Sequence, residues 1–195
     1  MDLPRGYLSP SQIALVLQNP KQYVKQYIHG EAGWTSEQQK FGSMIHNILE
    51  GRAKTPKTLL KKLSDVPKYK KHDVEIKTLL KRKAVKLELL GRLDGLGINQ
   101  GEYKTGMIPW TQRKANESLQ LRIYALIEYK NTKEIPNQKL SWLQSEWKGE
   151  KIILTGQCQT FHVKHDLKTM LETEALVWRA YDRIISLLTE EYSKI

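Results

Sequence analysis

The stretch KLELLGRLDGLGINQGEYKTG, residues 86–106, constrains the fold of this chain more than any other part of its sequence. Leu87, Leu89 and Leu93 alternate with polar or small residues, and glycines follow them, which is typical of a β-hairpin. The loop is expected at NQG, residues 99–101, because glycine often takes the left-handed third position of a three-residue hairpin loop. The sequence thus predicts two antiparallel strands that carry the charged residues of GRLDG and GEYKTG.

Helical patterns stand before and after this hairpin. SPSQ and NPKQ each place a capping residue before a proline, which predicts two short helices that break at Asn19-Pro20. Apolar side chains at helical spacing in residues 36–51 predict a third helix, which contains His46 and ends at Gly51. Residues 111–130 have an amphipathic pattern, and a long helix is expected from about residue 167 to residue 192.

The remaining segments differ in character. Residues 52–86 are rich in lysine, and LLKKL and VEIKTLLKRKA suggest short amphipathic helices on either side of a looser stretch. Two strands are expected in KLSWLQSEW and KIILTGQCQTFHVK, with a turn at residues 148–150 between them.

A chain of 195 residues is long enough for one good core and too short for two ordinary domains, so we expect one domain over residues 1–195. The predicted fold class is α/β, with a small mixed β-sheet flanked by helices. Its successive parts are the N-terminal helices (1–51), the lysine-rich helical and loop segment (52–86), the hairpin (87–106), the amphipathic helix (111–130), and the strands and terminal helix (139–195).

The charge balance predicts a polyanionic partner. The chain has 32 Lys and Arg residues against 21 Asp and Glu residues, a net charge of +11, so nucleic acid is the expected class of partner. No apolar run approaches the ~20 residues that span a bilayer, and the N-terminus has no secretory pattern. We therefore expect no membrane partner and a cytoplasmic protein, in the host cytoplasm if a phage encodes it. Cys158 is the only cysteine, which excludes an internal disulfide and an iron–sulfur cluster held by this chain alone.

The strand pattern brings three charged residues to one face of the hairpin. Residues i and i+2 of a strand share a face, so Glu102 and Lys104 point the same way and Tyr103 points to the other face. A loop with an odd number of residues also puts Asp94 on the face of Glu102. In the expected register Asp94 lies opposite residue 106, so a tighter register or a bulge at a glycine is needed to bring the two carboxylates level.

Two carboxylates on one face suit Mg²⁺, which proteins hold through one or two carboxylates together with water and phosphate oxygens. Such an ion activates water and neutralises charge on a phosphate. Lys104 could orient the water, accept a proton if its pKa is depressed, or stabilise the transition state.

The order of GRLDG and GEYKTG resembles the active-site hairpin of the PD-(D/E)XK nuclease superfamily. His46 follows Gly42 by one helical turn, and Gln120 and Tyr124 stand one turn apart in QLRIYALIEY. Together with the N-terminal segment YLSPSQIALVLQNPKQYVKQYI, these ordered motifs over residues 7–129 resemble the RecB-like exonuclease family. The resemblance implies a restriction-endonuclease-like core and a stand-alone nuclease without an iron–sulfur cluster.

Site roles follow from the same resemblance. It implies that Asp94, Glu102, His46 and the backbone carbonyl of Tyr103 hold one or two Mg²⁺ or Mn²⁺ ions. Lys104 would activate water and stabilise charge. Gln120 and Tyr124 would position the hairpin and contact the DNA strand. Independently of the family, Trp110 lies just after the hairpin, where it could stack on a nucleobase or pack in the core.

The resulting expectation is a metal-dependent deoxyribonuclease, an exonuclease, that acts in DNA recombination, repair or replication, for example in a phage. No Walker motif is present, so a helicase would be a separate protein, as would an annealing partner. One alternative is a catalytically inert nucleic-acid-binding or assembly module that keeps the fold. Another is an interaction subunit whose basic face docks an acidic protein.

Overall fold

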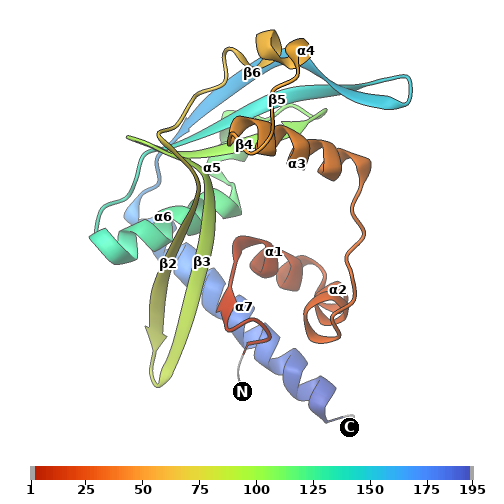
Figure 1. The fold of residues 1–195 in the computed structure, drawn as a ribbon. Coiled ribbons are helices and arrows are strands. Elements are labelled where there is room, and N and C mark those ends of the chain that lie inside the picture. The colour runs from red at the N-terminus through yellow and green to blue at the C-terminus, as the bar shows by residue number, and fades with distance from the viewer. Residues whose placement is uncertain (1–2, 194–195) are drawn as a thin grey trace.

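A six-stranded mixed sheet carries the predicted hairpin, and helices cover both of its faces (Figure 1). The computed structural model describes residues 3–193. The sheet order is β1-β3-β4-β5-β6, and β2 pairs along the other edge of β3. The pairs β1/β3 and β4/β5 are parallel, and the other neighbours are antiparallel. The strands are β1 (Tyr7–Leu8), β2 (Lys71–Arg82), β3 (Val85–Leu96), β4 (Gln100–Gly106), β5 (Gln138–Lys148) and β6 (Lys151–Val163).

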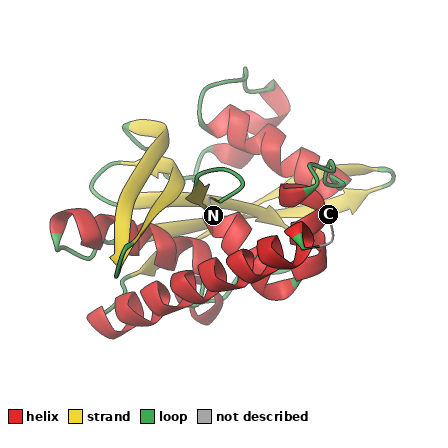
Figure 2. Cartoon of the chain, turned by 90° about the horizontal axis from the view of Figure 1, so that it is seen from below, coloured by secondary structure: helices red, strands yellow, loops and turns green. Residues whose placement is uncertain are grey.

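The helices complete a mixed α/β fold, as the sequence predicts. They are α1 (Pro10–Gln18), α2 (Pro20–Tyr23) with the π-helical turn η1 (Val24–Ile28), α3 (Glu37–Leu49), α4 (Lys57–Leu60) with the 3₁₀ turn η2 (Lys61–Leu63), α5 (Gln112–Asn116), α6 (Leu119–Thr132) and α7 (Leu167–Tyr192). Figure 2 shows α7 running along the molecule as its longest helix. Within residues 3–193, no helix has the length and apolarity required to cross a membrane.

Local capping explains the N-terminal helices. The side chain of Ser9 accepts a hydrogen bond from the N–H of Gln12, and Asn19 does the same for Gln22, so the predicted break at Asn19-Pro20 is confirmed. Ser36 opens α3 with a reciprocal capping box. Gly51, with a φ of 75°, follows its end. The predicted third helix is therefore confirmed.

The helix predicted for VEIKTLLKRKA is wrong, because these residues belong to β2. The stretch is apolar at helical spacing, and its apolar residues Val74, Ile76 and Leu80 also share one face of a strand, so its periodicity is ambiguous. Pairing with β3 along the whole strand decides in favour of β structure, and it buries Thr78 and Leu80.

The predicted position of the hairpin loop is also wrong, by two residues. Gly95 pairs with Gly101 and Leu96 with Gln100, which leaves residues 97–99 as the loop. Gln100 is held in β4 because its side-chain oxygen accepts a hydrogen bond of 2.8 Å from the amide of Gln138. The tighter register places Asp94 across from Glu102, which the NQG loop did not.

The single helix predicted at residues 111–130 is wrong in one respect, since it divides into α5 and α6. Thr111 caps α5, and Ser118 has an extended ψ of 113° just before α6. The inward face of α6 forms as expected, with Ile123, Leu126 and Ile127 fully buried.

The two faces of β4 serve different layers. Tyr103 packs with Ile45 and Ile48 of α3 on one face. Glu102 and Lys104 pair with Leu140 and Trp142 of β5, whose apolar cluster includes residues of α5 and α6. The catalytic candidates therefore point to the α6 side of the sheet, as the alternation predicts.

The paired glycines of the hairpin form a slot for the ring of Tyr69. A Cβ atom at Gly95 or Gly101 would lie 2.1 Å from this ring, far inside van der Waals contact. The ring also packs against Tyr103 at a centroid distance of 5.7 Å. Tyr69 thus packs the segment that precedes β2 against the face of the hairpin that carries Tyr103.

We expect Gly101→Ala to lower the free energy of unfolding by about 1–3 kcal/mol, because the added methyl group overpacks the slot. Gly106→Ala in the same strand is the control, since its Cβ would meet its nearest neighbour at an ordinary 3.8 Å. Denaturant unfolding measures both, and the cost of Gly101→Ala should shrink in a Tyr69→Ala background. Equal stability of the two single variants would refute the slot.

Candidate functional site

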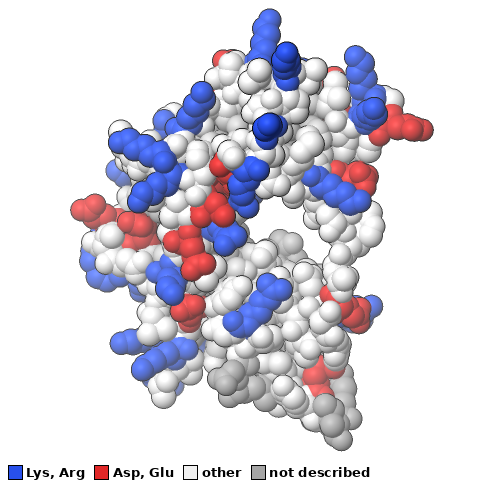
Figure 3. All heavy atoms as spheres, viewed as in Figure 1, with Lys and Arg blue, Asp and Glu red and all other residues white. Residues whose placement is uncertain are grey.

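A cavity of about 1140 Å³ lies between α3, the β3–β4 hairpin and the start of α6. Figure 3 shows a hollow between the upper part of the molecule and the lower part, which contains α1 and α2. Acidic side chains gather on its inner wall beside lysines and arginines. Five predicted site residues line the cavity: His46, Asp94, Lys104, Gln120 and Tyr124.

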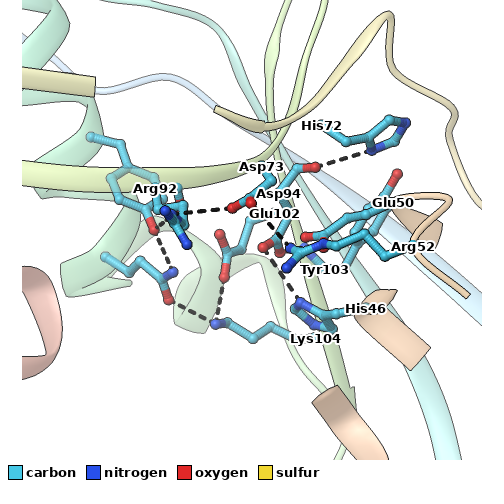
Figure 4. A network of polar contacts seen from close by, with 12 residues as sticks. His46, Glu50, Arg52, His72, Asp73, Arg92, Asp94, Glu102, Tyr103 and Lys104 are labelled. Carbon is cyan, nitrogen blue, oxygen red and sulfur yellow. Dashed lines mark hydrogen bonds and ion pairs between the residues drawn. The ribbon is translucent and has the colours of Figure 1, made fainter. Parts of the chain in front are cut away.

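Asp94 links three elements of the site (Figure 4). Its Oδ2 accepts a hydrogen bond of 2.7 Å from the backbone N–H of Tyr103 in β4. Its Oδ1 lies 3.4 Å from Nδ1 of His46 in α3. The carboxylate therefore has a fixed orientation and one oxygen directed toward the imidazole.

Glu102 lies behind the cavity wall and is only 1% exposed. Its Oε1 is 2.5 Å from Nζ of Lys104, while its Oε2 has no hydrogen-bond partner among the described residues. A buried carboxylate oxygen without a partner is costly, because it has lost its water. A cation at this oxygen would compensate for that loss.

A chain of hydrogen bonds holds Lys104 in place. Its Nζ donates to Oε1 of Gln120 at 2.7 Å, and the amide nitrogen of Gln120 donates to the hydroxyl of Tyr124 at 2.6 Å. The hydroxyl in turn donates to the backbone carbonyl of Arg92 at 2.6 Å. Gln120 and Tyr124 share one face of α6, as predicted, and through these bonds they connect Lys104 of β4 to Arg92 of β3.

Close packing of α3 on β4 brings His46 to the site. A Cβ atom at Gly42 would lie 2.9 Å from the hydroxyl oxygen of Thr105. Gly42 therefore makes room for the side chain of Thr105. Glycine lets the helix approach near enough for His46 to reach Asp94.

Glu50 is a site residue that the sequence analysis missed. Its carboxylate, the imidazole of His46 and the carboxylate of Asp94 each offer a ligand atom within 4.8 Å of the others. The side chain of Glu50 is 4% exposed and forms an ion pair with Arg52. It stands one helical turn after His46, and this spacing was the available signal.

These observations fit a divalent cation. The donor set consists of carboxylate oxygens and one imidazole nitrogen, which suits Mg²⁺ or Mn²⁺. The partnerless oxygen of Glu102 lies outside the group formed by His46, Glu50 and Asp94.

The electrostatics of the site follow from burial and proximity. Burial, with the nearby charge of Asp94, raises the pKa of Glu102 from 4.5 to about 7, although Lys104 opposes this. Burial lowers the pKa of His46, but the hydrogen bond and charge of Asp94 outweigh it and leave this pKa above its ordinary value. Burial also disfavours the ammonium of Lys104, yet Glu102 holds its pKa above the usual range. The pKa of Lys104 is thus raised, and not depressed as acceptance of a proton would require.

The tryptophan at the cavity is not the predicted one. Trp110 packs partly against an apolar cluster and beneath the ammonium of Lys114, and it is not among the described residues that line the cavity. Its contact with DNA stays a prediction. Trp34, in the segment between η1 and α3, lines the cavity and is 85% exposed.

Comparison with solved structures shows a shared fold. A protein from Eubacterium rectale, to which exonuclease activity has been provisionally assigned, superposes with a TM-score of 0.59 at 14% identity, over 95% of this chain and 82% of that one. The alkaline exonuclease LHK-Exo from Laribacter hongkongensis gives a TM-score of 0.45 at 13% identity, over 97% and 95% of the two chains. No protein-family model and no curated sequence matches the chain. At this identity the likeness to the Eubacterium rectale protein concerns the fold.

The raised pKa of Glu102 predicts how stability depends on pH. In EDTA, burial disfavours the ionised carboxylate of Glu102 only in the folded state. The contribution of Glu102 to the free energy of unfolding is therefore most favourable below pH 4.5 and is lost as the pH rises to about 7. The melting temperature of the wild-type protein should therefore fall relative to that of Glu102→Gln across this range and then run parallel to it. A difference that does not change between pH 4.5 and 7 would contradict the assignment.

Proposed function

We propose that this chain is a metal-dependent deoxyribonuclease of the RecB-like branch of the PD-(D/E)XK superfamily, and an exonuclease. One observation carries the proposal: Asp94, Lys104, His46 and Gln120 line one cavity, although α3, the hairpin and α6 are separate in sequence. Glu102 is buried behind the wall of this cavity and pairs with Lys104. The shared fold with the Eubacterium rectale protein supports it.

The proposed ligands of the cation are Asp94, Glu102 and His46, with the carbonyl of Tyr103. Glu50 joins them because it lies within reach of His46 and Asp94. One or two Mg²⁺ or Mn²⁺ ions held there would supply an activated water and offset the negative charge of the phosphate. The imidazole favours Mn²⁺ over Mg²⁺.

The residues of the chain itself position the reaction. Lys104 lines the cavity, and its ammonium stabilises the negative charge that develops on the cleaved phosphate. Gln120 keeps this ammonium in place through Tyr124 and the carbonyl of Arg92. The N–H of Tyr103 fixes the carboxylate of Asp94.

The form of the cavity favours attack from a DNA end. The segment at residues 29–36 runs along the outer side of the hollow from η1 to α3, and it supplies Trp34 to the lining (Figures 1 and 3). A strand that enters by its end can pass beneath this segment more easily than an internal stretch of duplex. The net charge of +11 supports DNA as the substrate. We place the enzyme in recombination, repair or replication, with a separate helicase or annealing protein as a partner.

Substitution of the catalytic candidates tests the reaction. Lys104→Ala and Asp94→Asn should each lower the rate of cleavage of linear DNA by at least about 100-fold, in line with the loss of one stabilising charge. Lys168→Ala, an exposed lysine of α7, is the matched control and should cleave like the wild type.

The assay uses end-labelled single- and double-stranded DNA, linear and circular, with Mg²⁺, Mn²⁺ or EDTA. We expect release of nucleotides from linear substrates and no cleavage in EDTA. Binding of DNA without cleavage in every condition would instead support an inert module. Cleavage of circular DNA at the same rate would exclude the exonuclease assignment.

Trp34 should contribute to binding of a single-stranded end, because stacking of a base on an aromatic ring stabilises a complex by about 1–3 kcal/mol. Trp34→Ala should weaken binding of a single-stranded oligonucleotide about tenfold, as measured by fluorescence anisotropy in EDTA. Trp147→Ala, which removes another exposed ring, is the control. Equal affinities of these two variants would remove Trp34 from the binding site.

A further inference from the structure

Asp73 has an unusual backbone conformation for a strand residue. It lies in β2 with a φ of 53°, between His72 and Val74, which pair regularly with β3. The left-handed region costs about 1–2 kcal/mol for a residue with a side chain, although aspartate tolerates it better than most. Such a conformation persists only where its surroundings hold it.

Two arginines contact the carboxylate of Asp73 (Figure 4). Nε of Arg92 lies 3.2 Å from Oδ1, and a terminal nitrogen of Arg52 lies 3.4 Å from Oδ2. Arg92 stands two residues before Asp94 in β3, and Arg52 follows Glu50 after the end of α3. Asp73 therefore joins a guanidinium group of β3 to one that follows α3.

Stability alone does not explain this arrangement. The side chains of Arg92 and Arg52 are 62% and 48% exposed, and ion pairs as exposed as these contribute about 0–1 kcal/mol each. That contribution is no larger than the cost of the backbone conformation at Asp73. The arrangement holds the two arginines in position at little or no gain in stability.

Both arginines line the cavity, and so does Asp73. The contact with Asp73 uses Nε of Arg92, and a guanidinium has four further N–H donors. Asp73 pairs with both arginines and Glu50 pairs with Arg52, so two carboxylates offset the two positive charges, and the remaining N–H groups act as directed donors. Guanidinium groups bind phosphate oxygens through paired hydrogen bonds, so their natural ligand beside a nuclease site is the backbone of the substrate strand.

We propose that Arg92 and Arg52, joined by Asp73, bind one phosphate of the DNA strand, adjacent to the phosphate that is cleaved. The inference rests on the proposed nuclease function and adds the contact that sets the register of the strand. The two guanidinium groups also reduce the repulsion between that strand and the carboxylates of Glu50 and Asp73, with which they pair.

The test measures binding in EDTA, where no cleavage occurs. Single-stranded oligonucleotides carry a neutral methylphosphonate at one position each, and anisotropy gives their affinities for the wild type, Arg92→Ala, Arg52→Ala and Arg92→Lys. Arg113→Ala is the control, because Arg113 is 86% exposed and pairs with Glu117 on α5, away from the cavity. Melting temperatures confirm that each variant is folded.

We expect Arg92→Ala and Arg52→Ala each to weaken binding of unmodified DNA about tenfold. One methylphosphonate position should weaken binding by the wild type and by Arg113→Ala, yet leave Arg92→Ala unaffected. Arg92→Lys keeps the charge without the paired donors, so it should recover only part of the affinity. If Arg92→Ala does not fold, Arg92→Lys takes its place in the comparison of affinities.

Two results would overturn the inference alone while the wild type still cleaves DNA. One is unchanged affinity in Arg92→Ala and Arg52→Ala. The other is an equal loss on every modified oligonucleotide, which would indicate diffuse attraction. A wild-type protein that neither binds nor cleaves DNA would overturn the proposed function, and this inference with it.

Discussion

The carboxylate of Asp94 is the contact on which the site depends. Backbone pairing between β3 and β4 stops at Gly95 and Gly101, and beyond that point the side chain of Asp94 takes the N–H of Tyr103. The same carboxylate faces His46, so it joins α3 to the hairpin. Without it, both strands would lose the link that keeps Glu102 level with Asp94.

Charge balance is the second constraint on this region. Glu102 is buried with one oxygen bound to Lys104 and the other without a partner, and burial disfavours its ionised form. Glu50 and Asp73 add two further carboxylates, which the arginines partly offset. A divalent cation would complete the balance, so cation binding and the stability of the folded state should be coupled.

Much of the secondary structure could be predicted because its signals are local. The caps at Ser9 and Asn19 act on N–H groups three residues away, so the sequence near each of them is sufficient. Two of the errors occur where pairing with another segment decides. β2 is a strand because β3 lies beside it, and Gln100 belongs to β4 because Gln138 bonds to it. Neither contact is visible in the local pattern.

The sequence by itself determined which side chains of the hairpin share a face, since a strand alternates with a period of two and an odd loop preserves parity. It also placed Gln120 and Tyr124 one turn apart on a helix. Only the tertiary structure decided the distances. In the tighter register Gly95 pairs with Gly101, and this pairing forms the slot that the ring of Tyr69 fills. The packing of α3 on β4 and the pairing of β2 with β3 brought in Glu50, Asp73 and Arg52, because contacts between elements set which charges meet.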